Sequence, residues 1–315
     1  MATVFAGVGA ISAGALAFYN GNKTRELDTK HHAGDVHRER ESALRDRFAA
    51  VSAQLANDSA AIRLGAVYSA AALADDWHNF GDDEERRVCI ELLRAYLRVP
   101  PKFVTPVDEY GTEYEPSPGD QESRQTIVRL IATRAHLATD NPKAWPLDQC
   151  SLTRSQLPMV SLPEVNLTDM DLTASDLSGS QLTGAELAGA TLNTADLVGA
   201  DMSGIVLQEA TMFGTKLNSA TLIGADLSGA KMSGASCVGT NFKDTILAGA
   251  SLLGANLKAA NFTDADLTHA KLNRANMADA ILVRAETTGA VLTDTNLDGA
   301  DLSGTTLADR NGSDD

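Results

Sequence analysis

Cysteine is scarce in this 315-residue chain, and the positions of the few that occur exclude two common stabilising devices. The three cysteines, Cys89, Cys150 and Cys237, are odd in number and lie far apart. Disulfide-rich domains and structural zinc sites need paired or closely spaced ligands. We therefore expect no disulfide framework, no bound metal and no cofactor, and a reducing compartment fits best.

Basic residues are also few. The sequence has 26 Lys and Arg against 42 Asp and Glu, which gives a formal net charge of -16 and a pI near 4.7. Proteins that bind nucleic acid directly use clustered Lys and Arg to displace counterions from the phosphates. This balance argues against direct nucleic-acid binding and favours a protein partner with a basic surface.

Aromatic residues make up only 5% of the chain, and they are unevenly distributed. Every Trp and Tyr lies before residue 146, whereas Gly and Ala become regularly spaced only after it. The hydrophobic content of 43% is ordinary for a globular protein. The length and the shift in composition predict two folding units with a boundary near residue 146.

Charge is absent from residues 2–19, which are rich in Ala and Gly. A helix of that length would span roughly 27 Å, close to the thickness of the hydrocarbon core of a bilayer. We therefore expect residues 1–20 to be a membrane anchor, followed by a polar linker over residues 21–35. The basic residues after the anchor would hold the rest of the chain on the cytoplasmic face of the inner membrane.

Two alternatives remain open for residues 2–19. The segment could be a helix buried elsewhere in the protein or a disordered segment, either of which would make the protein cytoplasmic. It could also be a cleaved secretory signal, because Ala15-Leu16-Ala17 has the form of a cleavage site. The sequence before the apolar stretch lacks the basic residues that such signals have.

Residues 36–140 are expected to form an α-helical domain. Apolar residues recur every three or four positions in four segments. These segments are 37–57, 59–81, 82–99 and 121–138. Between the last two, several prolines and the lack of an apolar period predict a loop over residues 100–120.

After residue 146 the sequence repeats with a period of five, as in the pentapeptide A-D-L-S-G. Every fifth residue from Leu162 to Leu307 is large and apolar, with Thr287 as the single exception. The residue two places earlier is usually Ala, and every Gly between residues 164 and 309 lies two places later. Glycine in one fixed slot predicts a recurring turn with positive φ at each corner of a coil.

Runs such as GADLSGA (residues 224–230) resemble the pentapeptide-repeat family. The resemblance implies a right-handed quadrilateral β-helix over residues 147–309, with four repeats to a coil and the Leu and Ala pointing inward. The fold class is thus α+β multidomain, an N-terminal α-helical region followed by a pentapeptide-repeat solenoid, with a disordered tail at 310–315. Segments 63–76 and 86–98 resemble the helical region of actinobacterial members with hydrophobic N-terminal segments.

The register of five extends back through Leu157, Leu152 and Leu147, so about eight coils are expected. Because proline lacks an N–H donor, Pro158 and Pro163 predict irregular first coils. A filled core with no loop at any corner leaves no cleft for converging catalytic groups. We therefore predict that the protein is not an enzyme.

Residues 20 apart should stack on one side of such a coil, which sorts the outward charges into four sides. The side centred on Leu187 and Leu227 has acidic residues and no Lys or Arg. Its acidic residues, which we take as a candidate partner-binding face, include Asp169, Glu186, Glu209, Asp226, Asp266 and Glu286.

Three functions are compatible with this face. The first is a non-catalytic protein–protein interaction scaffold, tethered to a membrane through residues 2–19. The second is a mimic of DNA that modulates gyrase or another topoisomerase, as the resemblance to fluoroquinolone-resistance members of the family suggests. The third is a solvated surface that only keeps a structural spacer soluble.

Overall fold

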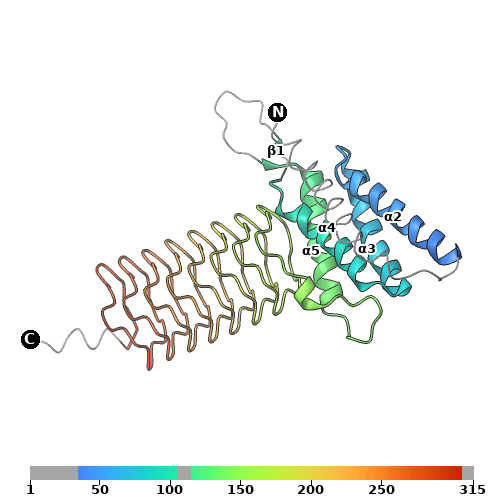
Figure 1. Cartoon of the computed structure of the whole chain (residues 1–315). Helices are drawn as coiled ribbons and strands as arrows, with labels where there is room; N and C mark the ends of the chain where they lie inside the picture. Colours follow the sequence, from blue (N-terminus) through green and yellow to red (C-terminus); the bar gives the residue numbers. More distant parts are fainter. Residues whose placement is uncertain (1–34, 102, 105–114, 307–315) are drawn as a thin grey trace, which may run out of the picture. The chain divides into compact units, whose positions relative to one another are not determined.

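A computed structural model gives the structure of residues 35–101, 103–104 and 115–306 (Figure 1). The chain divides into two compact units, Met1–Cys150 and Ser151–Asp315, which are described separately. The expected membrane segment and the expected tail at 310–315 lie outside the described residues.

The described helices of the first unit follow the predicted segments. They are α2 (Asp35–Leu55), α3 (Ala60–Phe80), α4 (Asp83–Arg98) and α5 (Pro118–Ala135). Helix α3 packs against the other three helices, and the buried side chains include Leu73 and Trp77 of α3, Leu93 of α4 and Ile127 of α5. Burial of these apolar side chains is the main source of the unit's stability.

The boundary between α3 and α4 follows from two adjacent residues. Gly81 has a φ of 87°, and its N–H donates to the carbonyl of His78, which ends α3. Glycine adopts this left-handed conformation without a steric penalty. Asp82 then caps α4, because its side chain accepts a hydrogen bond from the N–H of Glu85.

The segment between α4 and α5 was predicted to be a loop, but the structure contains a short strand pair within it. Strand β1 (Phe103–Val104) pairs antiparallel with β2 (Glu115–Pro116). Two residues in each strand are too few to give a period-two pattern, so the sequence did not reveal the pairing.

Buried charges join α4 to α5. The carboxylate of Asp120 accepts hydrogen bonds from Tyr96 Oη (2.5 Å) and Arg124 Nε (2.7 Å). The Arg124 guanidinium also donates to the carbonyls of Leu97 and Val99 at the end of α4. Both charged side chains are only 2% exposed. Burial and the adjacent Asp120 carboxylate raise the pKa of Tyr96, so the phenol stays protonated.

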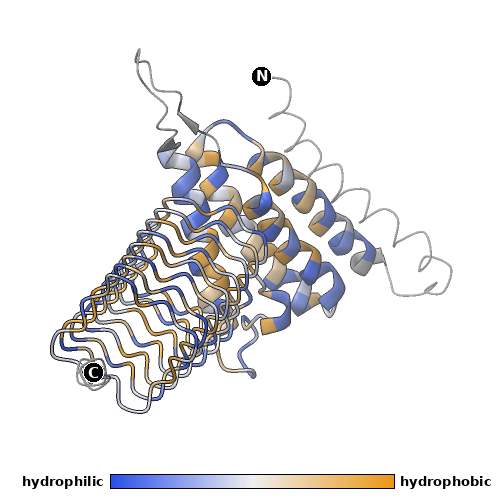
Figure 2. Ribbon diagram, turned by 90° about the vertical axis from the view of Figure 1, so that its left-hand side faces the viewer, coloured by the Kyte–Doolittle hydropathy of each residue, from blue (hydrophilic) through white to orange (hydrophobic). Residues whose placement is uncertain are grey.

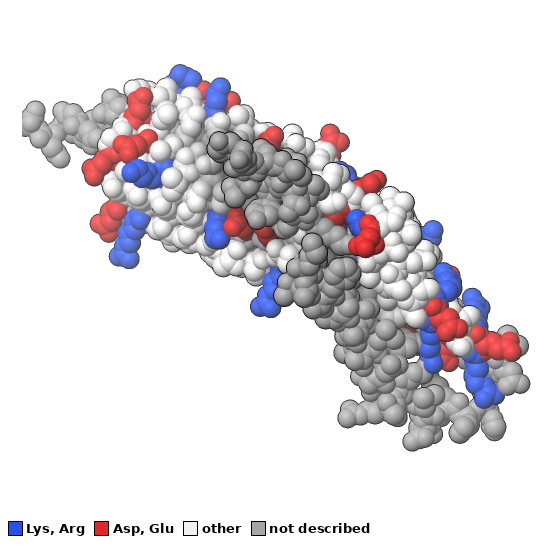
Figure 3. All heavy atoms as spheres, turned by 90° about the horizontal axis from the view of Figure 1, so that it is seen from above, with Lys and Arg blue, Asp and Glu red and all other residues white. Residues whose placement is uncertain are grey.

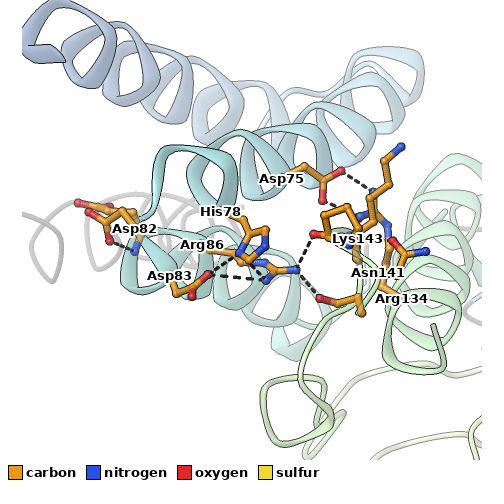
Figure 4. Close-up of polar contacts among 11 residues, drawn as sticks. Asp75, His78, Asp82, Asp83, Arg86, Arg134, Asn141 and Lys143 are labelled. Carbon is orange, nitrogen blue, oxygen red and sulfur yellow. Dashed lines mark hydrogen bonds and ion pairs between the residues drawn. The ribbon is translucent and has the colours of Figure 1, made fainter. Parts of the chain in front are cut away.

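A second polar cluster fixes the segment that follows α5 (Figure 4). Arg134 on α5 binds both carboxylate oxygens of Asp75 on α3 (2.6 and 2.9 Å). Arg86 on α4 lies 3.2 Å from Nδ1 of His78 and donates to the carbonyl of Ala144. Both arginines thus contact main-chain carbonyls or side chains of neighbouring helices, as expected of a structural cluster.

The second unit is a stack of coils in which one residue of every five pairs with the residue 20 places later. Parallel bridges run in four columns, for example Gln156 with Asp176 and Ser161 with Gln181. Four bridges in every 20 residues make each coil four-sided, and the described chain forms nearly eight coils. Only three residues lie between one turn and the next, so each bridge stands alone. The described coils contain no strand longer than a single bridge residue.

Leucine and alanine fill the interior of the coils, as the period of five predicted. Leu187, Leu207 and Leu227 are fully buried, as are Ala185 and Ala225. Phe242 and Phe262 stack inside the rod with ring centroids 4.9 Å apart. Figure 2 shows polar and apolar residues alternating along every coil. An outward polar and inward apolar alternation is what a solid solenoid requires.

Two predictions about the first coils are wrong. Leu147 is not an inward residue; it lies in the 3-10 helix η1 (Leu147–Gln149) and is 40% exposed. The coil hydrogen bonds begin at Leu152. Pro158 and Pro163 do not disturb the ladder, because they occupy the first central position of a turn, where proline is favoured and no ladder donor is needed.

Every corner uses the left-handed backbone conformation, whether or not glycine is present. Gly224 has a φ of 64°, and Thr194 at the equivalent corner position has a φ of 56°. A β-branched residue is strained there. Corners without glycine, about half of the total, therefore adopt the same turn as the others, and they do so at a cost in backbone strain.

Thr287 is the one polar residue at the leucine position of the repeat. It is 4% exposed, and its Oγ1 lies 2.8 Å from Oγ1 of Thr306. The hydroxyl thus has a hydrogen-bond partner near the end of the described coils.

Ser180 provides a test of how strictly the rod interior must be apolar. Its side chain is fully buried, and its Oγ has no hydrogen-bond partner in the structure. A buried hydroxyl without a partner loses its hydration energy. We expect Ser180→Ala to stabilise the rod by about 1 kcal/mol, measured by chemical denaturation followed by far-UV circular dichroism.

Ser175 is the matched control, because it occupies the same position of the preceding repeat. Its Oγ donates to the carbonyl of Leu172 at 2.7 Å. Ser175→Ala removes that bond and should destabilise the rod by about 0.5–1.5 kcal/mol. Equal effects of the two substitutions would contradict the assignment of Ser180 as unpaired.

Candidate functional site

The predicted acidic residues lie on one side of the rod. Parallel bridges link Glu186 to Val206, Val206 to Asp226, Asp226 to Ile246, Ile246 to Asp266 and Asp266 to Glu286. We call Glu186, Asp226, Asp266 and Glu286 the acidic column. Adjacent coils are about 4.8 Å apart, so Glu186 and Asp226 are separated by roughly 10 Å.

The other two predicted residues, Asp169 and Glu209, lie at the corner that follows this side. Their φ values are 57° and 56°. A Cβ added to Gly189 would lie 2.2 Å from Oδ1 of Asp169, and one added to Gly229 would lie 2.2 Å from Oε1 of Glu209. Each acidic side chain therefore lies along the rod, in the space left by the glycine one coil later.

The carboxylate of Asp226 is held in one orientation. It accepts hydrogen bonds from the N–H of Ser228 (2.9 Å), from Ser228 Oγ (2.6 Å) and from Gln208 Nε2 (2.6 Å). Burial works to raise the pKa of Asp226, but these hydrogen bonds outweigh it, so the pKa lies below its usual value. The residue is thus a fixed negative charge at neutral pH.

Glu286 is held in a similar way. Its Oε1 accepts hydrogen bonds from the N–H and the hydroxyl of Thr288. These bonds lower the pKa of Glu286, against a smaller opposing effect of the neighbouring Asp266 carboxylate. Glu286 is therefore ionised at neutral pH.

Sequence reasoning missed two aliphatic residues in the same line. Val206 and Ile246 alternate with the acids along the bridges, and Ile246 is 42% exposed. The signal was present in the sequence, because both residues stand 20 places from an acid of the column. A partner that lies along this side would meet acidic and apolar groups in alternation.

The basic residues of the other sides are partly neutralised by acids one coil away. Arg284 binds Asp264 through two hydrogen bonds (2.6 and 2.7 Å), and Lys216 lies 3.1 Å from Asp196. Figure 3 shows a surface on which acidic and basic side chains are interspersed. The side that bears the acidic column differs in that it has no Lys or Arg at all.

The repeat geometry agrees with a family comparison. The model of pentapeptide repeats matches eight copies, over residues 166–204, 195–234, 235–277 and 270–309. The chain belongs to the pentapeptide-repeat family. Membership implies a right-handed quadrilateral β-helix, which agrees with the four bridge columns described above.

Solved structures of other pentapeptide-repeat proteins align with part of this one. HetL from the cyanobacterium Nostoc sp. strain PCC 7120 is 24% identical, over 48% of this chain and 86% of HetL, with a TM-score of 0.25. QnrB1, a plasmid-mediated fluoroquinolone resistance protein, is 17% identical over 48% of this chain and 97% of its own, with a TM-score of 0.27. No curated protein sequence matches significantly.

A third pentapeptide-repeat protein, alr5209 from Nostoc PCC 7120, is 41% identical over a shorter stretch. The alignment covers 26% of this chain and 68% of alr5209, with a TM-score of 0.26.

The three cysteines of this pentapeptide-repeat protein are buried. Burial raises the pKa of the Cys150 and Cys237 thiols to about 12, and it also raises the pKa of Cys89. A thiol with such a pKa is inert at neutral pH. Over the described ranges, His, Cys, Asp and Glu form no group of three that could hold a metal ion, and none of the helices there is long and apolar enough to cross a bilayer.

Proposed function

We propose that this pentapeptide-repeat protein is a non-catalytic interaction scaffold that presents the acidic column to a basic protein surface. The observation that supports the proposal is the contrast between this side, which has acids and no Lys or Arg, and the other sides, which carry cations, some of them paired with acids. Complementary charge of this kind speeds encounter and selects the partner more than it adds affinity.

The rigidity of the rod supports the same proposal. Main-chain hydrogen bonds join each coil to the next, for example from the N–H of Leu227 to the carbonyl of Ile246 (2.7 Å). The carboxylate of Asp226 is also held by three hydrogen bonds. A surface whose groups are already fixed loses little entropy on binding.

Charge reversal tests the proposal. We expect the double substitution Asp226→Lys and Asp266→Lys to reduce binding of the physiological partner at least tenfold, because like charges then face each other across the contact. The partner is first captured from native membranes with the full chain, and its affinity for each purified variant is then measured. Unchanged affinity of the double variant would contradict the proposal and favour a purely structural spacer.

The chain offers a matched control on other sides of the rod. Asp176 and Asp201 make the same local hydrogen bonds to Ser178 and Ser203 that Asp226 makes to Ser228. The double substitution Asp176→Lys and Asp201→Lys changes the net charge equally but leaves the acidic column intact. Binding should be retained by this control.

A DNA mimic that acts on a topoisomerase is the second candidate, and the acidic column is the observation that favours it. The acids of the column lie roughly 10 Å apart where an aliphatic residue intervenes, whereas duplex DNA carries one charge per about 1.7 Å. A supercoiling assay with purified gyrase separates the candidates. Inhibition that is lost in the Asp226→Lys and Asp266→Lys variant would favour the mimic.

Tethering through residues 2–19 is the remaining part of the proposal, with the scaffold on the cytoplasmic face of an inner membrane. It rests on the uncharged segment and the basic residues that follow it. Fractionation of cells that express the full chain is the test. Recovery of the protein in the soluble fraction would remove the membrane anchor and leave a cytoplasmic scaffold.

A further inference from the structure

One stripe of α3 is apolar and exposed, although α3 is covered elsewhere by α2, α4 and α5. Ile62 is 43% exposed and Tyr68 is 58% exposed. Ala61, Gly65 and Ala72 continue the stripe at helical spacing, and all three are exposed. We call these five residues the α3 stripe; it contains no charged residue.

Gly65 is the feature of the α3 stripe that no described residue explains. Glycine within a helix costs about 0.5–1 kcal/mol relative to alanine. A Cβ added to Gly65 would meet no atom of the described residues within 4 Å. By contrast, a Cβ added to Gly119 would lie 2.3 Å from Cβ of Ala60, so Gly119 allows α5 to approach α3. Gly65 allows an equally close approach on the open side of α3.

The large and small residues of this face are arranged symmetrically about Gly65. Ile62 and Tyr68 stand three places before and after it, and Ala61 and Ser69 stand four places before and after it. The hydroxyl of Ser69 donates to the carbonyl of Gly65 (2.8 Å), so its polar group is already satisfied. A face with this symmetry is complementary to itself when a second copy is turned by 180°.

We propose that α3 is a dimerisation helix, on which a second copy of this chain packs antiparallel about a twofold axis at Gly65. In that arrangement Ile62 of each copy meets Tyr68 of the other, and the two glycines meet at the axis. The lack of charge supports a second copy as the occupant. Each copy carries a formal net charge of -16, so repulsion between copies is least where the meeting faces are neutral.

The size of the face sets the expected strength of the dimer. Residues 61–72 form about three helical turns, and a contact of that size lies at the lower end of specific interfaces. We therefore expect dimerisation in the micromolar range, which attachment of both copies to one surface would strengthen through a higher local concentration.

Sedimentation equilibrium of the purified full chain in mild detergent, at protein concentrations up to about 100 µM, is the first test. The wild-type chain should dimerise, and Gly65→Lys should weaken the dimer at least tenfold by placing two like charges at the axis. Lysine favours helices, so the circular dichroism of the variant should not change. The control is Ala53→Lys on an exposed position of α2, which should dimerise as the wild type does.

A cross-linking experiment tests the geometry. The native cysteines are buried, so an introduced surface thiol is the reactive one. Chains with Ile62→Cys mixed with chains with Tyr68→Cys should form disulfide-linked heterodimers on mild oxidation. Ala72→Cys should not cross-link to itself, because the two copies of residue 72 would lie about 21 Å apart along the helix axes.

Two results would overturn the proposal. One is a monomer at every concentration tested, and the other is an oligomer that Gly65→Lys leaves unchanged. A monomer in which the thiol of Tyr68→Cys is also protected from maleimide would identify residues 2–19, in place of a second copy, as the segment that covers the α3 stripe.

Discussion

Replacement of Asp120 by alanine is expected to destabilise the helical unit by about 3–5 kcal/mol. Arg124 would then keep its charge in a site where its side chain is 2% exposed, and Tyr96 would lose its hydrogen-bond acceptor. An uncompensated buried charge is among the most costly defects a protein can contain. Both Trp residues of the chain, Trp77 and Trp145, lie in this unit, so tryptophan fluorescence during urea denaturation measures its unfolding selectively.

Two further variants distinguish the effect of losing the buried ion pair from a general disruption of the helical unit. Glu91 forms ion pairs with Arg94 and Arg98 at the surface of α4, where its side chain is 48% exposed. Glu91→Ala should therefore cost less than about 1 kcal/mol. The double substitution Asp120→Leu and Arg124→Met removes both charges and should regain much of the lost stability. A double variant as unstable as Asp120→Ala would show that the charges themselves are not the cause.

Phe242→Ala is expected to destabilise the rod by about 3–5 kcal/mol. Phe242 is fully buried, and its ring stacks on that of Phe262 at 4.9 Å with an interplanar angle of 6°. Removal of the ring leaves a cavity in an interior where the neighbouring coils are fixed by main-chain hydrogen bonds and cannot collapse into it. Hydrogen exchange measured by mass spectrometry reports the effect coil by coil.

The loss of stability in the Phe242→Ala variant should be confined to the coils near Phe242. Each coil of a solenoid contacts only its neighbours, so amides between residues 222 and 262 should exchange faster while those near Leu157 are unchanged. Phe213→Ala is the control, because Phe213 is 44% exposed and its loss should cost less than about 0.5 kcal/mol. Uniformly faster exchange along the rod would contradict the nearest-neighbour description.

The period of five made most of the rod predictable. The inward register from Leu152 onward, the stacking of residues 20 apart and the gathering of Asp226 and Asp266 on one side all follow from counting along the chain. The helices were predictable for a similar reason, because their apolar residues recur with the helical period.

The features that the sequence did not reveal depend on contacts between distant residues. Asp120 and Arg124 resemble an ordinary surface pair one helical turn apart, and only the packing of α5 on α4 buries them. Leu147 continues the period of five but lies in the 3-10 helix η1, where its side chain is 40% exposed. The exposed stripe of α3 was also hidden, because its residues are as apolar as those on the covered faces.

The bridges between residues 20 places apart tie the rod's surface to the length of its chain. Removal of one complete coil, such as residues 211–230, would shorten the rod and leave every later residue on its original side. Removal of a single pentapeptide would instead rotate everything beyond it by a quarter turn, and Asp266 would move to a different side from Asp226. The spacing between recognition groups on one side of the rod can thus change only by whole coils.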